Sequence, residues 1–134
     1  MVFHKWDSIK VTEFLARGHI YLYRTSNKWR DQYPRVVAEA LAAGLPVLTE
    51  PRDGTNDRVI NGDTGLHCID YDMFLDAVKK LRRKEKYRQA MGQHAKDWAR
   101  VSLDPRLWVE TLDQLFYGEE AIHESQVLQR SNQR

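Results

Sequence analysis

The sequence predicts an α/β fold with a short parallel sheet, for three reasons. Short apolar stretches rich in β-branched and aromatic residues alternate with segments whose apolar residues recur at helical spacing. Strands that alternate with helices pair in parallel, through right-handed crossovers. The strands are also nearly all apolar, as in a sheet that is covered on both faces. We therefore expect three layers, with the sheet in the middle.

About four strands are expected. The clearest covers residues 19–25, which are dense in aromatic and β-branched side chains, and shorter strands cover residues 46–50 and 64–69. Residues 2–4 are expected to form a fourth strand, truncated by the start of the chain.

Helices are expected between the strands and after the last one. Pro34 suits the first turn of a helix whose broad apolar face ends at Gly44. Three helices in succession then close the domain, which departs from strict alternation. The expected helices run from Ser8 as N-cap to about Arg17, from Pro34 to Gly44, from Asp72 as N-cap to about Leu81, over residues 84–101, and from Pro105 to about Phe116.

Composition predicts one soluble domain over residues 1–117, followed by a polar tail over residues 118–134. The net charge of +2 is too small to indicate nucleic acid binding. No apolar run approaches the roughly 18 residues that a membrane helix needs, and the single cysteine, Cys68, cannot form an internal disulfide. These features predict a cytoplasmic protein with no membrane span. No group of histidines, cysteines or acids has metal-ligand spacing, so no structural metal is expected.

Chemistry is expected at the carboxyl ends of the strands, where open parallel sheets bind ligands. The loop after residues 19–25 contains Asp31 and leads into the helix at Pro34, and Glu39 lies one and a half turns inside that helix. Free N–H groups and the positive dipole end at a helix start suit a phosphate, and carboxylates accept hydrogen bonds from sugar hydroxyls. A diphosphate flanked by a ribose and a hexose would use all of these features. In a second loop, over residues 50–57, Gly54 permits a close backbone approach to a ligand or a positive φ.

Residues 31–48, DQYPRVVAEALAAGLPVL, resemble the signature of the group 1 family of retaining glycosyltransferases, which includes sucrose and glycogen synthases and phosphatidylinositol mannosyltransferases. That signature has two glutamates separated by seven residues, an alanine-rich helix and Gly-Leu-Pro-Val. The likeness covers roughly residues 2–117. It implies a Rossmann-like domain, the donor-binding C-terminal half of an enzyme of the GT-B type. Further matches to its glycine-rich loop and the turn after it are Gly54, Asp57, Val59, Asn61, Gly62, Thr64 and Gly65.

The resemblance implies roles for particular residues. Asp31 corresponds to the catalytic acid that contacts the hydroxyls of the transferred sugar, and Glu39 to the acid that holds the nucleotide ribose. The implied reaction is a hexosyl transfer from a nucleoside-diphosphate sugar with retention of configuration, without a metal or another cofactor. Gln32, Tyr33 and Pro34 correspond to residues beside the sugar, and the backbone N–H groups of Arg35 and Val36 to those that face the diphosphate.

The sequence also departs from the family's pattern. Asp31 stands where glutamate is usual, so its carboxylate reaches one methylene less. The family's basic pair that clamps the diphosphate precedes the matched region, and Lys28 and Arg30 are the candidates to replace it. The acceptor-binding domain is not part of the match. We therefore expect the chain to need an N-terminal acceptor-binding domain or subunit, and to be inactive alone.

Simpler interpretations stay open. Asp31 beside a helix start is equally explained as an ordinary cap. Glu39 taken alone is more simply a solvated helix residue, but its spacing from Asp31 favours a ligand role. The alternative function is a catalytically inactive interaction module that keeps the fold and associates, with itself or with a separate N-terminal subunit, through exposed apolar surface. The transferase hypothesis fails if the Glu39 side chain is buried against the sheet or points away from the cleft.

Overall fold

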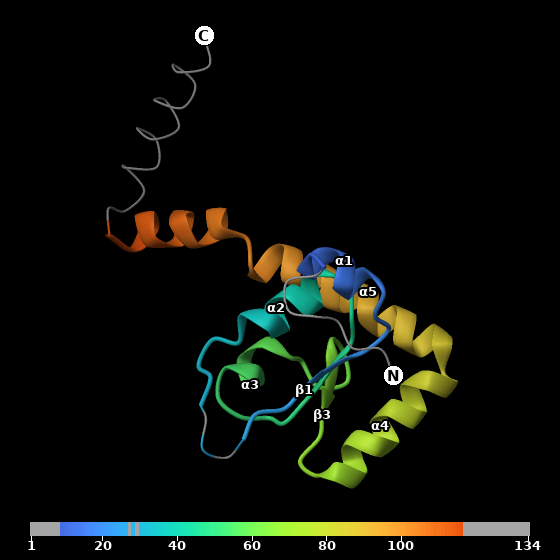
Figure 1. Cartoon of the computed structure of the whole chain (residues 1–134). Coiled ribbons are helices and arrows are strands. Elements are labelled where there is room, and N and C mark those ends of the chain that lie inside the picture. Colours follow the sequence, from blue (N-terminus) through green and yellow to red (C-terminus); the bar gives the residue numbers. More distant parts are fainter. Residues whose placement is uncertain (1–8, 27, 29, 117–134) are drawn as a thin grey trace. The chain divides into compact units, whose positions relative to one another are not determined.

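The computed structural model describes residues 9–26, 28 and 30–116, and divides the chain into two units, residues 1–100 and 101–134. The first unit contains a parallel sheet with the strand order β1-β2-β3 (Figure 1). Its strands are β1 (Tyr21–Tyr23), β2 (Val47–Thr49) and β3 (Gly65–His67). The α/β class and the parallel pairing predicted from the sequence are therefore confirmed. No helix in the described residues is long and apolar enough to cross a membrane.

The helices of the first unit alternate with the strands until the last strand ends. They are α1 (Val11–Ala16), α2 (Arg35–Ala42), α3 (Gly54–Arg58), α4 (Tyr71–Arg83) and α5 (Glu85–Ser102), whose last two residues belong to the second unit. In the second unit, taken by itself, residues 105–116 are helical, and Asp104 accepts a hydrogen bond of 3.0 Å from the N–H of Arg106 at the start of that helix.

The two faces of the sheet differ in chemistry, because successive side chains of a strand point to opposite faces. Leu22, Leu48 and Leu66 lie side by side in the sheet's register, and we call their side the apolar face. Leu48 is fully buried in a core cluster that α4 and α5 complete. Members of that cluster from outside β2 are Cys68, Ala77, Leu81 and Met91.

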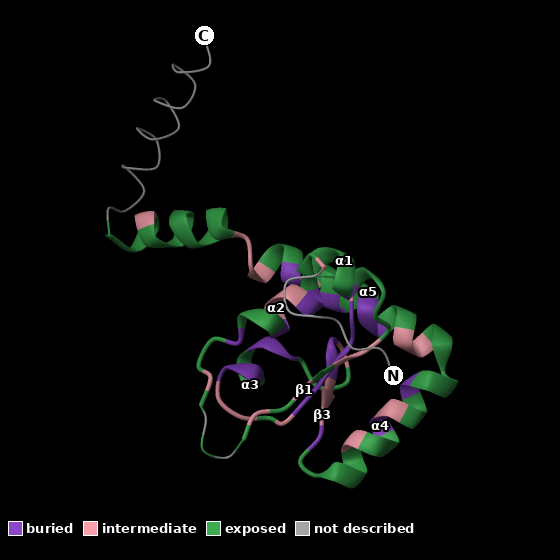
Figure 2. Ribbon diagram, viewed as in Figure 1, coloured by how far each residue is buried: buried purple, intermediate pink, exposed green. Residues whose placement is uncertain are grey.

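The opposite side, which we call the polar face, carries Tyr23, Thr49 and His67 in register. It is covered by α2 and α3. A Cβ atom on Gly65, which shares a side with His67, would lie only 2.7 Å from the side chain of Val59 at the end of α3. The loops at the carboxyl ends of β1 and β2 lead directly into these two helices. Residues that the structure buries concentrate on β2 and on the inner sides of α2, α3 and α5 (Figure 2).

The turn that ends α2 touches α5 through two glycines. Gly44 has a φ of 78°, in the left-handed region where glycine is favoured. A Cβ atom on Gly92 would lie 2.3 Å from the carbonyl oxygen of Gly44, so α5 approaches this turn at backbone contact. Both positions therefore require glycine, one for its conformation and the other for its lack of a side chain.

Several predicted boundaries are wrong in detail. Residues 54–58, expected to be loop, form α3, and α4 is capped two residues earlier than expected, because Asp70 rather than Asp72 accepts a hydrogen bond of 2.8 Å from the N–H of Met73. Pro34 is the N-cap of α2 rather than its first helical residue. The compact unit ends at residue 100, whereas a domain over 1–117 was expected. The expected strand at 2–4, the cap at Ser8 and the tail at 118–134 lie outside the described residues.

Candidate functional site

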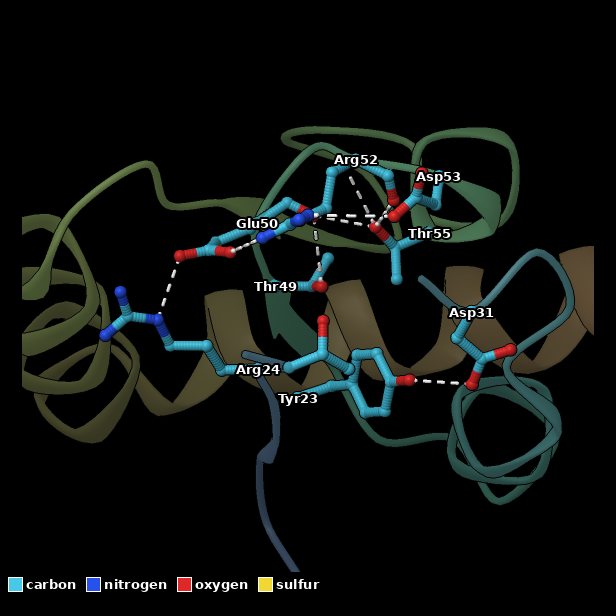
Figure 3. Close-up of a pocket in the computed structure, with 9 residues that line it drawn as sticks. Tyr23, Arg24, Asp31, Thr49, Glu50, Arg52, Asp53 and Thr55 are labelled. Carbon is cyan, nitrogen blue, oxygen red and sulfur yellow. Dashed lines mark hydrogen bonds and ion pairs between the residues drawn. The ribbon is translucent and has the colours of Figure 1, made fainter. Parts of the chain in front are cut away.

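A small hollow lies where β1 and β2 end, as expected for a parallel sheet. Its walls come from the ends of the two strands and from the loops that follow them (Figure 3). Charged groups of both signs meet there. The lining residues are Tyr23, Arg24, Thr25, Asp31, Thr49, Glu50, Arg52, Asp53 and Thr55.

Asp31, the predicted catalytic acid, points into this hollow with its carboxylate held at both oxygens. The phenol of Tyr23 donates a hydrogen bond of 2.8 Å to Oδ2, and the backbone N–H of Tyr33 donates one of 3.1 Å to Oδ1. Burial and this hydrogen bond raise the pKa of Tyr23 to about 12, so the phenol remains a donor at neutral pH. Asp31 does not cap α2, whose N-cap is Pro34 and has no side-chain cap bond. The carboxylate is thus oriented independently of the helix.

The start of α2 presents backbone donors, as the sequence predicted. The first N–H that pairs back onto the N-cap is that of Val37, 3.1 Å from the carbonyl oxygen of Pro34. The N–H groups of Arg35 and Val36 come before it, where a helix offers no partner of its own. Gln32 and Tyr33 are exposed beside this helix start, whereas Pro34 is buried. The segment therefore offers an anion two backbone donors at an accessible helix end.

Glu39 lies on α2 one turn beyond those donors. Its side chain is 34% exposed and forms an ion pair of 3.2 Å with Arg35. Burial, and to a smaller extent the charge of Glu39, raise the pKa of Tyr21. Glu39 is therefore neither sealed against the sheet nor fully solvated, but it is not among the residues that line the hollow, and its donor-binding role stays a prediction.

The loop after β2 is organised by charge pairs around Glu50. One oxygen of Glu50 accepts from Arg24 at 2.8 Å, and the other accepts from Arg52 at 3.3 Å. Asp53 has a positive φ of 49°, so the strained residue of this loop is Asp53 and not the glycine after it. The hydroxyl of Thr55 donates to the carbonyl oxygens of Glu50 and Arg52, both at 2.6 Å.

Gly54 joins the two loops to each other. Its N–H donates a hydrogen bond of 3.2 Å to the carbonyl oxygen of Asp31. A Cβ atom on Gly54 would lie 2.1 Å from the carbonyl oxygen of Gln32 and 2.8 Å from Cδ of Pro34. The close approach at Gly54 is therefore to the chain's own loop ahead of α2, and Gly54 is not among the glycines with a positive φ; an approach to a ligand stays a prediction.

The two candidates for the missing basic pair are both at the surface. Lys28 is exposed, and its backbone N–H donates to the hydroxyl of Ser26 at 3.3 Å. Arg30 has a side chain that is 76% exposed and lies 3.9 Å from a carboxylate oxygen of Asp53. Neither cation is held toward the start of α2 by a contact in the described residues.

A basic residue that the sequence analysis missed lies under the loop ahead of α2. Arg58, at the end of α3, is only 5% exposed, and its guanidinium stacks on the ring of Tyr33, 3.5 Å from the centroid. Arg58 was overlooked because the stretch around it was interpreted as loop. The spacing Gly54 to Arg58, one helical turn, is the signal that could have found it.

The described residues contain no group of three or more histidines, cysteines or acids that could hold a metal ion. Cys68 is buried and free, and burial raises the pKa of its thiol. Its sulfur lies in the core cluster of the apolar face, away from the loops described above.

Comparisons with known proteins agree with this architecture. The profile of the family described as "Glycosyl transferases group 1" matches residues 1–98. Spore coat protein SA of Bacillus subtilis (strain 168) is 26% identical over 87 residues, which cover 58% of this chain and 23% of that protein. The Anabaena protein Alr3699/HepE is similar in structure, with a TM-score of 0.62 and 17% identity in its complex with UDP-glucose. Its complex with UDP and glucose gives 0.63 and 16%.

The chain spans only part of the proteins it resembles. It covers about a quarter of the length of these proteins, 23% of the spore coat protein and 29% of the Anabaena protein, while 76% of this chain is matched in the latter. The likeness at 16% and 17% identity establishes the fold, a short parallel sheet followed by helices as in GT-B proteins.

Proposed function

Because the chain belongs to the group 1 family of glycosyl transferases, we propose that it is the donor-binding domain of an enzyme that transfers a sugar from a nucleoside-diphosphate sugar to an acceptor. The observation that carries the proposal is the arrangement around the start of α2. Backbone donors at Arg35 and Val36 lie between Asp31, oriented by two hydrogen bonds, and Glu39. The Anabaena protein of similar fold was crystallised with UDP-glucose, which makes a uridine nucleotide the first probe.

In this proposal, each feature of the site binds a different part of the sugar donor. The diphosphate accepts hydrogen bonds from the N–H groups at the start of α2, where the helix dipole favours an anion. Glu39 accepts hydrogen bonds from ribose hydroxyls, and its carboxylate also forms an ion pair of 3.2 Å with Arg35. Asp31 accepts from hydroxyls of the transferred sugar, and the shorter side chain places that sugar closer to β1 than a glutamate would.

The proposed reaction is transfer with retention of configuration. The acceptor oxygen forms a bond to the anomeric carbon while the bond from that carbon to the diphosphate oxygen breaks, and the acceptor's proton passes to the departing diphosphate. Negative charge therefore develops on the diphosphate in the transition state. Preoriented N–H donors stabilise such charge without reorganisation, which lowers the barrier. We propose that no metal takes part, so transfer by the assembled enzyme should persist in a chelator.

The acceptor would be bound by a second domain or subunit on the N-terminal side. The relatives are about four times as long as the part of them that this chain covers, which leaves room for such a domain. We therefore propose that the chain alone binds donor but does not transfer its sugar.

The test is calorimetric titration of the 134-residue chain with UDP, GDP and ADP, and with UDP-glucose. At least one diphosphate should bind. Glu39→Gln should weaken every nucleotide, whereas Asp31→Asn should weaken only the sugar nucleotide. Glu13→Gln is the matched control, because Glu13 also pairs with an arginine four residues away, on α1. Absence of binding by all three diphosphates, or unchanged binding by the Glu39 variant, would refute the proposal.

A second candidate function, an interaction module without catalysis, is favoured by exposed apolar surface between β1 and α4. Leu22 is 57% exposed there and forms one wall of an apolar groove of about 440 Å³. The remaining lining residues are Arg24, Tyr71, Phe74, Leu75 and Val78. A self-associating module would show a concentration-dependent mass in sedimentation equilibrium, and Leu22→Lys would abolish it. A constant monomer mass argues against this candidate.

A further inference from the structure

Arg58 carries a buried charge without a polar partner. Its Nη1 is buried and has no hydrogen-bond partner, and no carboxylate forms an ion pair with it within the described part of the chain. Its one recorded interaction is the stack on the ring of Tyr33. A cation–π contact offsets only part of the cost of removing a guanidinium from water. The stack on Tyr33 therefore does not by itself explain why a charged guanidinium is buried at this position.

The position of Arg58 links this incomplete charge to the start of α2. Gly54 and Arg58 are four residues apart and so lie on the same face of α3. That face touches the segment that leads into α2, since Gly54 is in contact with Gln32 and Pro34, and Arg58 with Tyr33. The guanidinium thus lies beneath the residues that open α2, beside the positive end of the helix dipole.

Two positive features side by side repel each other unless an anion lies between them. The other buried nitrogen without a partner in the described residues is Nε2 of His67, on the polar face that α3 covers. Both unpaired atoms are thus on the α3 side of the sheet. The acids of the hollow do not satisfy Arg58, because Glu50 and Asp53 are paired with Arg24 and Arg52 instead.

We propose that Arg58 is the residue that binds the diphosphate of the donor, in place of the basic pair that the matched region lacks. The inference rests on the proposed function for the identity of the ligand. Tyr33, whose side chain covers the guanidinium and is itself 66% exposed, turns aside so that Nη1 reaches a phosphate oxygen held at the start of α2. Lys28 and Arg30, at the surface, are not required.

The first experiment uses inorganic pyrophosphate as a probe of the 134-residue chain, followed by thermal unfolding. Pyrophosphate should raise the Tm of the wild type, because it binds the folded state alone. Arg58→Gln should abolish the shift. Arg88→Gln is the matched control: Arg88 is also a largely buried arginine, its side chain 14% exposed, but it donates to the carbonyl oxygen of Leu81 in the core and should leave the shift unchanged.

The second experiment compares UDP with uridine by calorimetry. Loss of one charge-assisted hydrogen bond should weaken UDP by about tenfold to a hundredfold in Arg58→Gln. Uridine, which lacks phosphate, should bind both proteins equally. Equal weakening of UDP and uridine, or an unchanged pyrophosphate shift, would overturn the role of Arg58.

The two proposals can fail separately. If pyrophosphate binds through Arg58 but no nucleoside diphosphate binds, the donor-binding function is wrong and the anion site stands. If UDP binds the Arg58 variant as it binds the wild type, the anion site is wrong and the function stands. Should Arg58→Gln fail to fold, Tyr33→Ala decides: uncovering Nη1 should tighten pyrophosphate binding, and unchanged or weaker binding contradicts the proposal.

Discussion

The apolar and polar faces of the same three-residue strands have different roles. On the apolar face, Leu48 is sealed in a core cluster with Leu81 and Met91. On the polar face, Tyr23 donates a hydrogen bond to Asp31 in the loop ahead of α2, and Nε2 of His67 is buried without a partner in the described residues. Because successive side chains of a strand point to opposite faces, those on one face pack in the core and those on the other face lie on the side of the proposed ligand site. Changes on the two faces should therefore have separable effects.

The largest effect is expected on the apolar face. Leu81→Ala empties a fully buried position between the sheet and α5, and should lower the free energy of unfolding by about 2–5 kcal/mol. Urea denaturation measures the loss. In the part of the sample that stays folded, the affinity for nucleoside diphosphates should not change. A large change in that affinity would break the division between the faces.

Gly54→Ala should reduce both stability and binding. The added Cβ would meet backbone atoms of Gln32 at 2.1 Å, so the loops after β1 and β2 must separate, at a cost of about 1–3 kcal/mol. Asp31 moves with its loop, and donor binding falls. Gly62→Ala is the control, because no atom lies within 4 Å of a Cβ there and only its φ of 87° is strained. That variant should lose stability but keep its ligand affinity.

A smaller loss is expected where α4 begins. Asp70→Ala removes the hydrogen bond to the N–H of Met73 and should cost about 1 kcal/mol. Asp72→Ala, in the first helical turn, loses only a favourable interaction with the helix dipole and should cost less. Paired denaturation curves of the two variants test the order. A greater loss of stability in the Asp72 variant would instead support Asp72 as the helix cap, as predicted from the sequence.

The smallest effect concerns Tyr23, which has a pKa of about 12 in the folded protein. A raised folded pKa means that the contribution to stability is complete below the ordinary pKa of 10.0 and is lost as the pH rises toward 12. Ultraviolet titration should show a late-ionising tyrosine that Tyr23→Phe removes. If every tyrosine ionises near pH 10, the hydrogen bond to Asp31 does not hold in solution.

Sequence reasoning predicted the sheet and the main helices of this fold better than the short segments that connect them. The parallel sheet and the helix after Pro34 followed from apolar patterns, which report burial directly. The helix at 54–58 could not be predicted in this way, because Gly54 and Asp57 are ordinary turn formers. Its conformation is set by tertiary contacts, namely the bonds of Thr55 and the packing of Gly54 against Gln32.

For the candidate site, sequence reasoning likewise identified some residues and missed another. Asp31 and Glu39 were proposed from their spacing and a family resemblance; the structure places Asp31 in the hollow, bonded to Tyr23 of β1, and the role of Glu39 stays a prediction. Arg58 was missed because a cation in a polar stretch reads as solvated. Only the fold reveals that it is buried, and its interaction with Tyr33 joins segments 25 residues apart in the chain.

The contact between Gly44 and Gly92 fixes the rear of α2, and this has a consequence for its front. The helix has eight residues, so its amino end is only about 12 Å from that contact. Because α2 is short and its carboxyl end is held by this contact, a tilt of the helix at that end also moves its amino end. A bulkier residue at position 92 would thus change the direction of the N–H groups that we propose to bind phosphate, without touching the ligand.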